Sequence, residues 1–101
     1  MGQEAIDTFR MCIPLFQALS DPARQDIILL LAENERLTVN EITEQATLSR
    51  PAISHHLKIL RDNNLVKIEQ KGTQRYYSLA IRQAVDLLKK LVYTIESTCD
   101  Q

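Results

Sequence analysis

The fold is decided by residues 38–79, TVNEITEQATLSRPAISHHLKILRDNNLVKIEQKGTQRYYSL, where two helical segments precede two strand-like segments. Thr38 followed three residues later by Glu41 is the capping-box pattern of a helix start. We expect this first helix to be short, over residues 39–46. A tight turn follows, and a second helix is expected from the Ser49 N-cap to about residue 63, because its apolar residues fall on one face.

The hydrophobic period changes from helical to alternating after this second helix. Alternating residues lie on each side of Lys71-Gly72, over 66–69 and 74–79, which predicts a β-hairpin with a basic tip. Two helices joined by a few residues and followed by such a hairpin form a winged helix-turn-helix. The helix-turn-helix is expected over 38–63 and the wing over 65–79.

Further helical segments flank this region. Apolar residues recur at steps of three and four in residues 4–20, where Pro14 is expected to kink or split the helix. An Asp-Pro start signal predicts a helix over 22–33. A final helix is expected over 80–98, and its apolar stripe suits a partner helix. The fold class is therefore mainly α with one β-hairpin, as a single winged helix-turn-helix domain over 1–101.

Composition limits the classes of function. The chain has 101 residues, of which 45% are hydrophobic and 25% charged, as in a globular domain. Its longest uninterrupted apolar run, residues 27–32, is far shorter than the roughly 20 residues of a membrane span. Glu4 and Asp7 stand where a signal peptide would be basic and then apolar, so we expect a cytoplasmic protein without a membrane partner. So small a chain leaves little room for a catalytic cleft, and we expect no enzyme.

The charge of the chain is unevenly distributed. The net charge is -1, yet residues 1–48 carry -5, residues 49–77 carry +4 and residues 78–101 are neutral. Such asymmetry affects association more than net charge does, so the middle segment is interpreted as a basic surface that faces nucleic acid. A chance fluctuation on a solvated face is the alternative.

The basic segment coincides with the helix that can enter a DNA major groove. Its apolar stripe of Ile53, Leu57 and Leu60 leaves the other side free for base contacts. Lys58 and Arg61 are expected on phosphates, which fix register without reading sequence. Ser49 can serve as an N-cap alone, and the hairpin can be an ordinary solvated one. The candidate DNA-contacting residues are Ser49, Arg50, Pro51, Ala52, Ser54, His55, Lys58, Arg61, Lys71, Thr73, Gln74 and Arg75.

The pair His55 and His56 does not predict a metal site. Adjacent residues on a helix point about 100° apart, so the two imidazoles cannot easily bind one ion. We expect His56 to be partly buried beneath the recognition face and His55 to face DNA or solvent. No catalytic residue, metal or cofactor is predicted.

Three stretches of the chain resemble the ArsR family of bacterial transcriptional repressors. They are LSDPAR at 19–24, LSRPAISHHLKIL at 48–60 and VKIEQKGTQRYYSL at 66–79. The resemblance implies a homodimer built by the first and last helices (1–20 and 80–98), which binds a palindromic double-stranded DNA operator. The apolar residues expected at the dimer interface are Ile6, Phe9, Ile13, Phe16, Val85, Leu88, Val92 and Ile95.

The resemblance also implies where a metal sensor of this family would carry its ligands. One family site has a Cys-x-Cys pair at the start of the first helix of the helix-turn-helix, and the matching positions here are Thr38 and Asn40. A second family site has Asp and His residues on the last helix, which contains no histidine in this chain. Neither position set offers the donors that zinc or thiophilic metals need, so we predict no metal sensing through them.

The inducing signal stays open. Cys12 and Cys99 lie on the first and last helices, which the resemblance brings together, so a redox switch is one hypothesis. Two small structural residues are the alternative, and a small-molecule inducer or none at all is equally open. A winged-helix module that binds proteins without reading DNA is the alternative function, because the fold alone does not fix function.

Overall fold

The computed structural model describes residues 2–99, apart from the side chain of Cys99, as five helices and one antiparallel hairpin. This architecture confirms the mainly α fold with a β-hairpin. Strand β1 pairs only with β2, from Val66 opposite Leu79 to Lys71 opposite Gln74. The order is α1 (Gln3–Leu19), α2 (Pro22–Glu33), α3 (Val39–Glu44), α4 (Arg50–Asp62), β1 (Val66–Lys71), β2 (Gln74–Leu79) and α5 (Arg82–Cys99).

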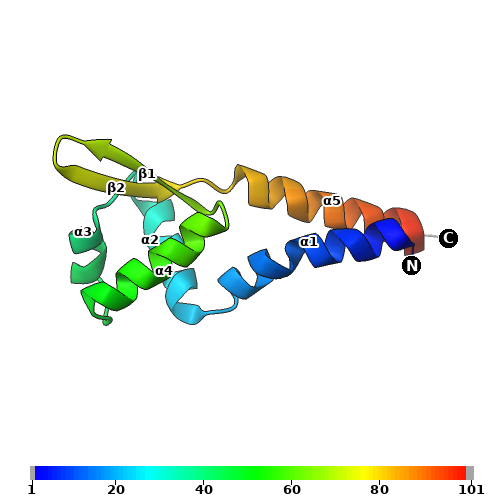
Figure 1. Cartoon of the computed structure of the whole chain (residues 1–101), viewed down its shortest axis with the longest axis horizontal. Helices are drawn as coiled ribbons and strands as arrows, with labels where there is room; N and C mark the ends of the chain where they lie inside the picture. Colours follow the sequence, from blue (N-terminus) through cyan, green and yellow to red (C-terminus); the bar gives the residue numbers. More distant parts are fainter. Residues whose placement is uncertain (1, 100–101) are drawn as a thin grey trace.

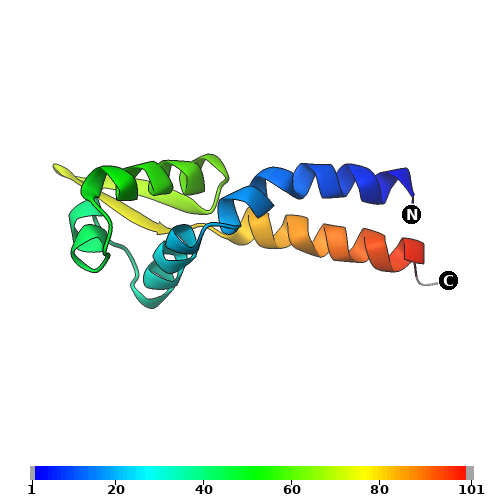
Figure 2. The ribbon, with the colours of Figure 1, turned by 90° about the horizontal axis from the view of Figure 1, so that it is seen from below.

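The molecule is elongated, at 53 by 25 by 20 Å. Helices α1 and α5 lie side by side and project as an arm from a body made by α2, α3, α4 and the hairpin (Figures 1 and 2). The radius of gyration is 16.1 Å, larger than the roughly 13 Å of a compact chain of this length, because the arm extends beyond the body.

The main core fills the body, and a narrower buried strip joins the arm. Ile42 from α3 and the α4 residues Ile53, Leu57 and Leu60 are almost fully buried and pack with apolar residues of α2 and β1. Along the arm, the buried residues are mostly small. These buried residues are Ala5, Thr8 and Cys12 on α1, with Leu91 and Thr94 on α5.

Pro14 does not split the first helix. Helix α1 is continuous from Gln3 to Leu19 with Pro14 inside it, and its ribbon bends toward its C-terminal end (Figure 2). Of the two expected effects, a kink or a split, the helix shows a bend and no split. A proline removes only its own N–H from the ladder, and the packing of both halves against the rest of the molecule keeps the helix in one piece.

The ends of two helices differ from the sequence expectation. Helix α3 ends at Glu44 rather than at residue 46, because the backbone N–H groups of Gln45 and Ala46 bond to carbonyls only three residues earlier. Helix α5 begins at Arg82 rather than at residue 80. The Ala80 N–H donates to the Leu65 carbonyl at 3.0 Å, so Ala80 extends the hairpin instead of starting the helix.

The first strand of the hairpin is longer than expected. Strand β1 continues to Lys71 rather than ending at residue 69, so the turn between the strands consists of Gly72 and Thr73. Gly72 has a φ of +63°, the conformation that the first position of a two-residue hairpin turn of type II′ requires. A side chain there would meet no atom within 4 Å, so conformation and not space favours glycine.

Helix α4 ends in a Schellman motif that leads the chain into the wing. Asn64 has a left-handed φ of +58° and donates its N–H to the Arg61 carbonyl. Leu65 donates to the Leu60 carbonyl at 2.9 Å, and both leucines are buried. This pair of bonds with an apolar contact is the usual way to satisfy the last carbonyls of a helix.

The connection between α2 and α3 is bound to the wing. Leu37 and Tyr77 exchange backbone hydrogen bonds of 2.9 and 2.7 Å, which forms an isolated antiparallel bridge. Thr38 then caps α3, with its hydroxyl accepting from the Glu41 N–H and the Glu41 carboxylate accepting from the Thr38 N–H. The start of α3 is thereby held beside β2.

Among residues 2–99, no helix combines the length and the apolar character needed to cross a bilayer.

Candidate nucleic-acid interface

The start of α4 is exposed on the side away from the core. The Ser49 hydroxyl accepts from the Ala52 N–H at 3.4 Å, and proline follows at the second helical position, where a missing N–H costs nothing. Ile53, Leu57 and Leu60 face the core, so Arg50 and Ser54 point into solvent. The sequence-predicted separation of a buried and a free face on α4 is confirmed.

A groove brings the start of α4 next to the wing. Its volume is about 420 Å³, and α3, α4 and the hairpin each contribute a wall. It unites five of the predicted contact residues, from two segments about 20 positions apart in the sequence. The lining residues are Thr38, Val39, Asn40, Arg50, Ser54, Thr73, Gln74, Arg75 and Tyr77.

Asn40 is a residue of this groove that the sequence analysis did not assign to DNA. Its Oδ1 accepts from Arg50 Nε at 2.8 Å, which restrains the guanidinium and leaves its two terminal nitrogens available to other partners. Because Asn40 lies ten residues before Arg50, only the relative placement of α3 and α4 brings them together. An asparagine at the second position of a capped helix, followed by an arginine after the next N-cap, is the only signal that the sequence offers.

The remaining predicted contacts lie outside the groove. The N-cap Ser49 and the α4 residues Pro51, His55, Lys58 and Arg61 are exposed, and Ala52 is half-buried. Two of the predicted basic residues have acidic partners. Lys58 Nζ lies 3.0 Å from Asp62, and Lys71 Nζ lies 3.3 Å from Glu69 beside a separate hollow behind the wing. A phosphate would compete with these carboxylates.

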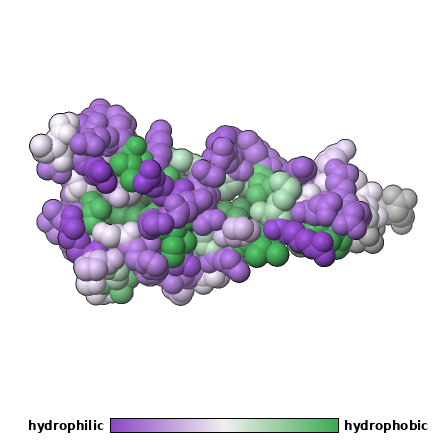
Figure 3. Space-filling view, viewed as in Figure 1, coloured by the Kyte–Doolittle hydropathy of each residue, from purple (hydrophilic) through white to green (hydrophobic). Residues whose placement is uncertain are grey.

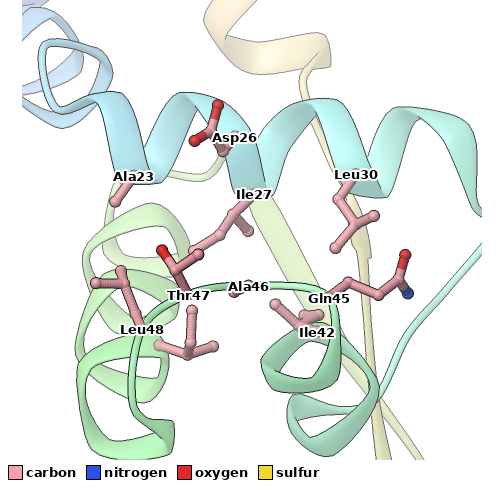
Figure 4. Close-up of a pocket in the computed structure, with 10 residues that line it drawn as sticks. Ala23, Asp26, Ile27, Leu30, Ile42, Gln45, Ala46, Thr47 and Leu48 are labelled. Atoms are coloured by element: carbon pink, nitrogen blue, oxygen red, sulfur yellow. The ribbon is translucent and has the colours of Figure 1, made fainter.

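A second hollow of about 360 Å³ lies between α2, α3 and the turn that joins α3 to α4 (Figure 4). Ile27 and Leu30 point into it from α2, whereas the carboxylate of Asp26 points away (Figure 4). None of the predicted DNA-contacting residues lines it. This hollow is therefore separate from the groove beside the wing.

His56 is half-buried and His55 is exposed, as expected from the sequence. The ring centroids are 5.9 Å apart, and the His56 Nδ1 atom lies 3.2 Å from Arg24 Nη1 of α2. His56 thus contacts a cation, which is no environment for a metal ligand.

The two positions that match a family metal site lie at the start of α3. Thr38 is the N-cap of α3 and Asn40 accepts from Arg50, so both side chains are engaged in hydrogen bonds within the protein. Over residues 2–99, the structure contains no group of three or more His, Cys, Asp or Glu side chains that could hold a metal ion.

Cys12 is a free and fully buried thiol between α1 and α5. Burial raises the pKa of this thiol above its ordinary value, because the thiolate would lose its hydration. The side chain of Cys99 lies outside what the structure describes, so the approach of the two cysteines stays a prediction.

The arm exposes apolar side chains on a face that nothing else within residues 2–99 covers. Ile13, Phe16 and Val92 are 40–53% exposed, and the other predicted interface residues Ile6, Phe9, Val85, Leu88 and Ile95 are half-buried. Two further exposed residues were not predicted, Met11 at 56% and Tyr93 at 72%. Figure 3 shows hydrophobic surface along the arm among hydrophilic residues.

The fold and the exposed α4 beside the wing define a DNA-binding protein of the winged helix-turn-helix class. Residues 21–67 match the family model described as "Bacterial regulatory protein, arsR family". An HTH-type transcriptional regulator of Methanocaldococcus jannaschii is 32% identical over 84 residues, which cover 83% of this chain and 94% of the relative. The transcriptional repressor SdpR of Bacillus subtilis is 42% identical over 65 residues, which cover 64% of this chain and 71% of the relative.

Solved structures agree with this assignment. Reduced HlyU from Vibrio cholerae is 25% identical, has a TM-score of 0.73, and the match covers 99% of this chain and 100% of that chain. The chain belongs to the ArsR family of bacterial transcriptional regulators.

Proposed function

We propose that this protein is a homodimeric repressor that reads a palindromic operator with α4 and holds the flanking backbone with its wing. The observation that carries the proposal is the groove in which Arg50 and Ser54 of α4 stand opposite Thr73, Gln74 and Arg75 of the hairpin. A major groove admits a helix, and its base edges form a distinct donor and acceptor pattern for each base pair. SdpR, a relative of this chain, is a transcriptional repressor, which supports repression.

Arg50 is the residue best suited to read a base. Its Nε is engaged by Asn40 at 2.8 Å, so the side chain is restrained while Nη1 and Nη2 remain available. A restrained guanidinium loses less conformational entropy on binding and can pair with the O6 and N7 acceptors of guanine. Ser54 lies one helical turn further along the same face and is suited to a second polar contact.

The arm supports a dimer with two-fold symmetry. It exposes Ile13, Phe16, Val92 and Tyr93 on its uncovered face, and a shallow apolar groove runs along Val85, Leu88 and Val92 of α5. Two-fold dimers are the commonest homo-oligomers, and a dimer of this kind presents two α4 helices to half-sites about one helical turn apart. The operator would then share the symmetry of the protein.

The test begins with a duplex selected from a random pool by the unmodified protein. Arg50→Ala and Ser54→Ala should each reduce the preference for this duplex over a scrambled one by about 1–3 kcal/mol, because a base contact is lost. Arg82→Ala is the matched control, since Arg82 is exposed and basic but lies at the start of α5, outside the groove.

Two outcomes would contradict the proposal. One is a selection that enriches no sequence, and the other is an unchanged base preference in both α4 variants. The alternative of a protein-binding module predicts the first outcome, together with weak and salt-insensitive retention on duplex DNA.

A further inference from the structure

Arg24 of α2 holds the end of α1. Its Nε donates to the Ala18 carbonyl at 2.7 Å, and its Nη2 donates to the Gln17 carbonyl at 3.1 Å. Both carbonyls belong to the last turn of α1, which has no basic residue of its own. The Gln17 carbonyl also accepts from the Ser20 N–H and hydroxyl, whereas the Ala18 carbonyl accepts from Arg24, and the guanidinium complements the negative end of the helix dipole. The arm is thereby tied to the start of α2.

The same guanidinium reaches the recognition helix. Arg24 Nη1 lies 3.2 Å from Nδ1 of His56 on α4 and 3.5 Å from the Asp21 carboxylate. Since a guanidinium can only donate, Nδ1 is the acceptor in this contact. The Arg24 side chain is only 12% exposed, so water screens this contact little.

Asp21 is the third partner of the Arg24 side chain, beside the end of α1 and His56. Its Oδ1 accepts from the Ala23 N–H at 2.8 Å as the N-cap of α2. That hydrogen bond lowers the pKa of Asp21, with a further contribution from Arg24, so the carboxylate stays charged beside the guanidinium. Arg24 is thus held in position by α1 and α2 before it meets α4.

Directional contacts from α4 to other helices are few. Over residues 2–99, side-chain hydrogen bonds join α4 to another helix at two places, Arg50 to Asn40 and His56 to Arg24. The other α4 packing against the core is apolar contact, mainly by Ile53, Leu57 and Leu60, which is non-directional and permits small rotations of the helix. A helix that reads base edges tolerates little misplacement.

We propose that the Arg24–His56 hydrogen bond is a positioning contact, which sets the orientation of α4 relative to the arm and so governs DNA affinity without touching DNA. The inference rests on the proposed function. The inference goes beyond the proposed function because neither Arg24 nor His56 lies among the predicted DNA-contacting side chains. In a dimer, the bond would transmit the geometry of the arm to each of the two reading helices.

The test compares His56→Leu, which removes the acceptor, with His56→Asn, whose side-chain oxygen can replace Nδ1. DNA affinity is measured on the selected duplex, well below the melting temperature of every variant, so that a loss of stability alone leaves the affinity unchanged. His56→Leu should bind about tenfold more weakly, and His56→Asn should recover most of that loss.

A matched control separates positioning from helix capping. Gln25 also donates to the end of α1, at 2.8 Å to the Leu19 carbonyl, but it makes no bond to α4. Gln25→Ala should therefore lower stability without changing DNA affinity. Arg24→Lys keeps the charge but cannot serve α1 and His56 together, so it should weaken DNA binding even if His56→Leu fails to fold.

The double variant Arg24→Lys/His56→Leu completes a double-mutant cycle with the two single variants. It should bind DNA no more weakly than the weaker single variant, because both changes break one bond. Unchanged affinity in Arg24→Lys, or fully multiplicative losses in the cycle, would overturn the inference while leaving the proposed function intact. Failure of the unmodified protein to select any duplex would defeat the proposed function instead.

Discussion

At the scale of single residues, the backbone conformation at a position determines which side chains are tolerated there. Asn64 ends α4 with a left-handed φ of +58°, a conformation that costs a side chain with a Cβ roughly 1–2 kcal/mol unless the residue is asparagine or aspartate. Asn64→Ala should therefore lower the free energy of unfolding by about 1 kcal/mol. Asn64→Gly should retain the stability of the unmodified protein. Urea denaturation of the two variants checks this, and an alanine variant as stable as the glycine variant would speak against the Schellman motif.

The buried thiol of Cys12 has a second consequence at the residue scale. Because burial raises its pKa and leaves the side chain inaccessible, Cys12 in the folded protein should react with a thiol reagent far more slowly than in the urea-unfolded chain. The rate should rise with pH as the thiolate forms. Cys99→Ser isolates the Cys12 signal. Fast modification of Cys12 at neutral pH in the folded state would contradict its placement between α1 and α5 and would favour the redox hypothesis.

At the scale of elements, local signals predicted the helices, and a non-local contact fixed the start of α5. Thr38, Glu41 and Ser49 are caps that bond within three residues, so the sequence alone located the starts of α3 and α4. The start of α5 was misplaced because Ala80 donates to Leu65, a contact that depends on the hairpin register. A contact between residues distant in sequence, such as this one, could not be predicted from local signals.

The candidate site follows the same rule. The free face of α4 was predictable from its apolar period, since Ile53, Leu57 and Leu60 had to face the core. The contact between Asn40 and Arg50 and the bond between Arg24 and His56 were not, because they join different helices across 10 and 32 positions. Neither hydrophobic periodicity nor a helix-capping signal indicates a contact between side chains on different helices.

The wing is expected to supply affinity without sequence preference. Lys71 is exposed at the end of β1 and pairs only with Glu69 at 3.3 Å, so a phosphate can replace the carboxylate. Lys71→Ala should weaken binding to all duplexes alike and reduce the slope of log affinity against log salt by about 1. Arg82→Ala is again the control, because Arg82 also carries an acidic partner, Asp86 at 3.6 Å, but lies on α5. Equal salt slopes for Lys71→Ala and the unmodified protein would remove the wing from the interface.

At the scale of the whole molecule, the arm is the feature that a single chain does not explain. It extends the molecule to 53 Å and leaves Ile13, Phe16, Val92 and Tyr93 exposed along α1 and α5. Apolar surface of this kind, bordered by polar residues, marks an association site. A second copy of the chain would cover it.

Phe16→Asp and Val92→Asp should each weaken the dimer by at least about 30-fold in sedimentation equilibrium, because a carboxylate would be buried in an apolar contact. Leu29→Asp is the control. Leu29 is 60% exposed on α2, away from the arm, so its replacement should leave the dimer unchanged. Both arm variants should also bind the selected duplex weakly. An unmodified protein that stays monomeric at micromolar concentration would refute the symmetric arrangement.

The most direct test of the central claim is an amide NMR titration of the isotope-labelled protein with the selected duplex. The claim is that α4 and the wing together form the DNA-binding face. Chemical-shift changes should concentrate at residues 49–58 and 71–75, with Asn40 beside them, and the outer face of α2 should stay unperturbed. Changes that gather instead on α2, or around the hollow between α2 and α3, would show that DNA meets a different surface.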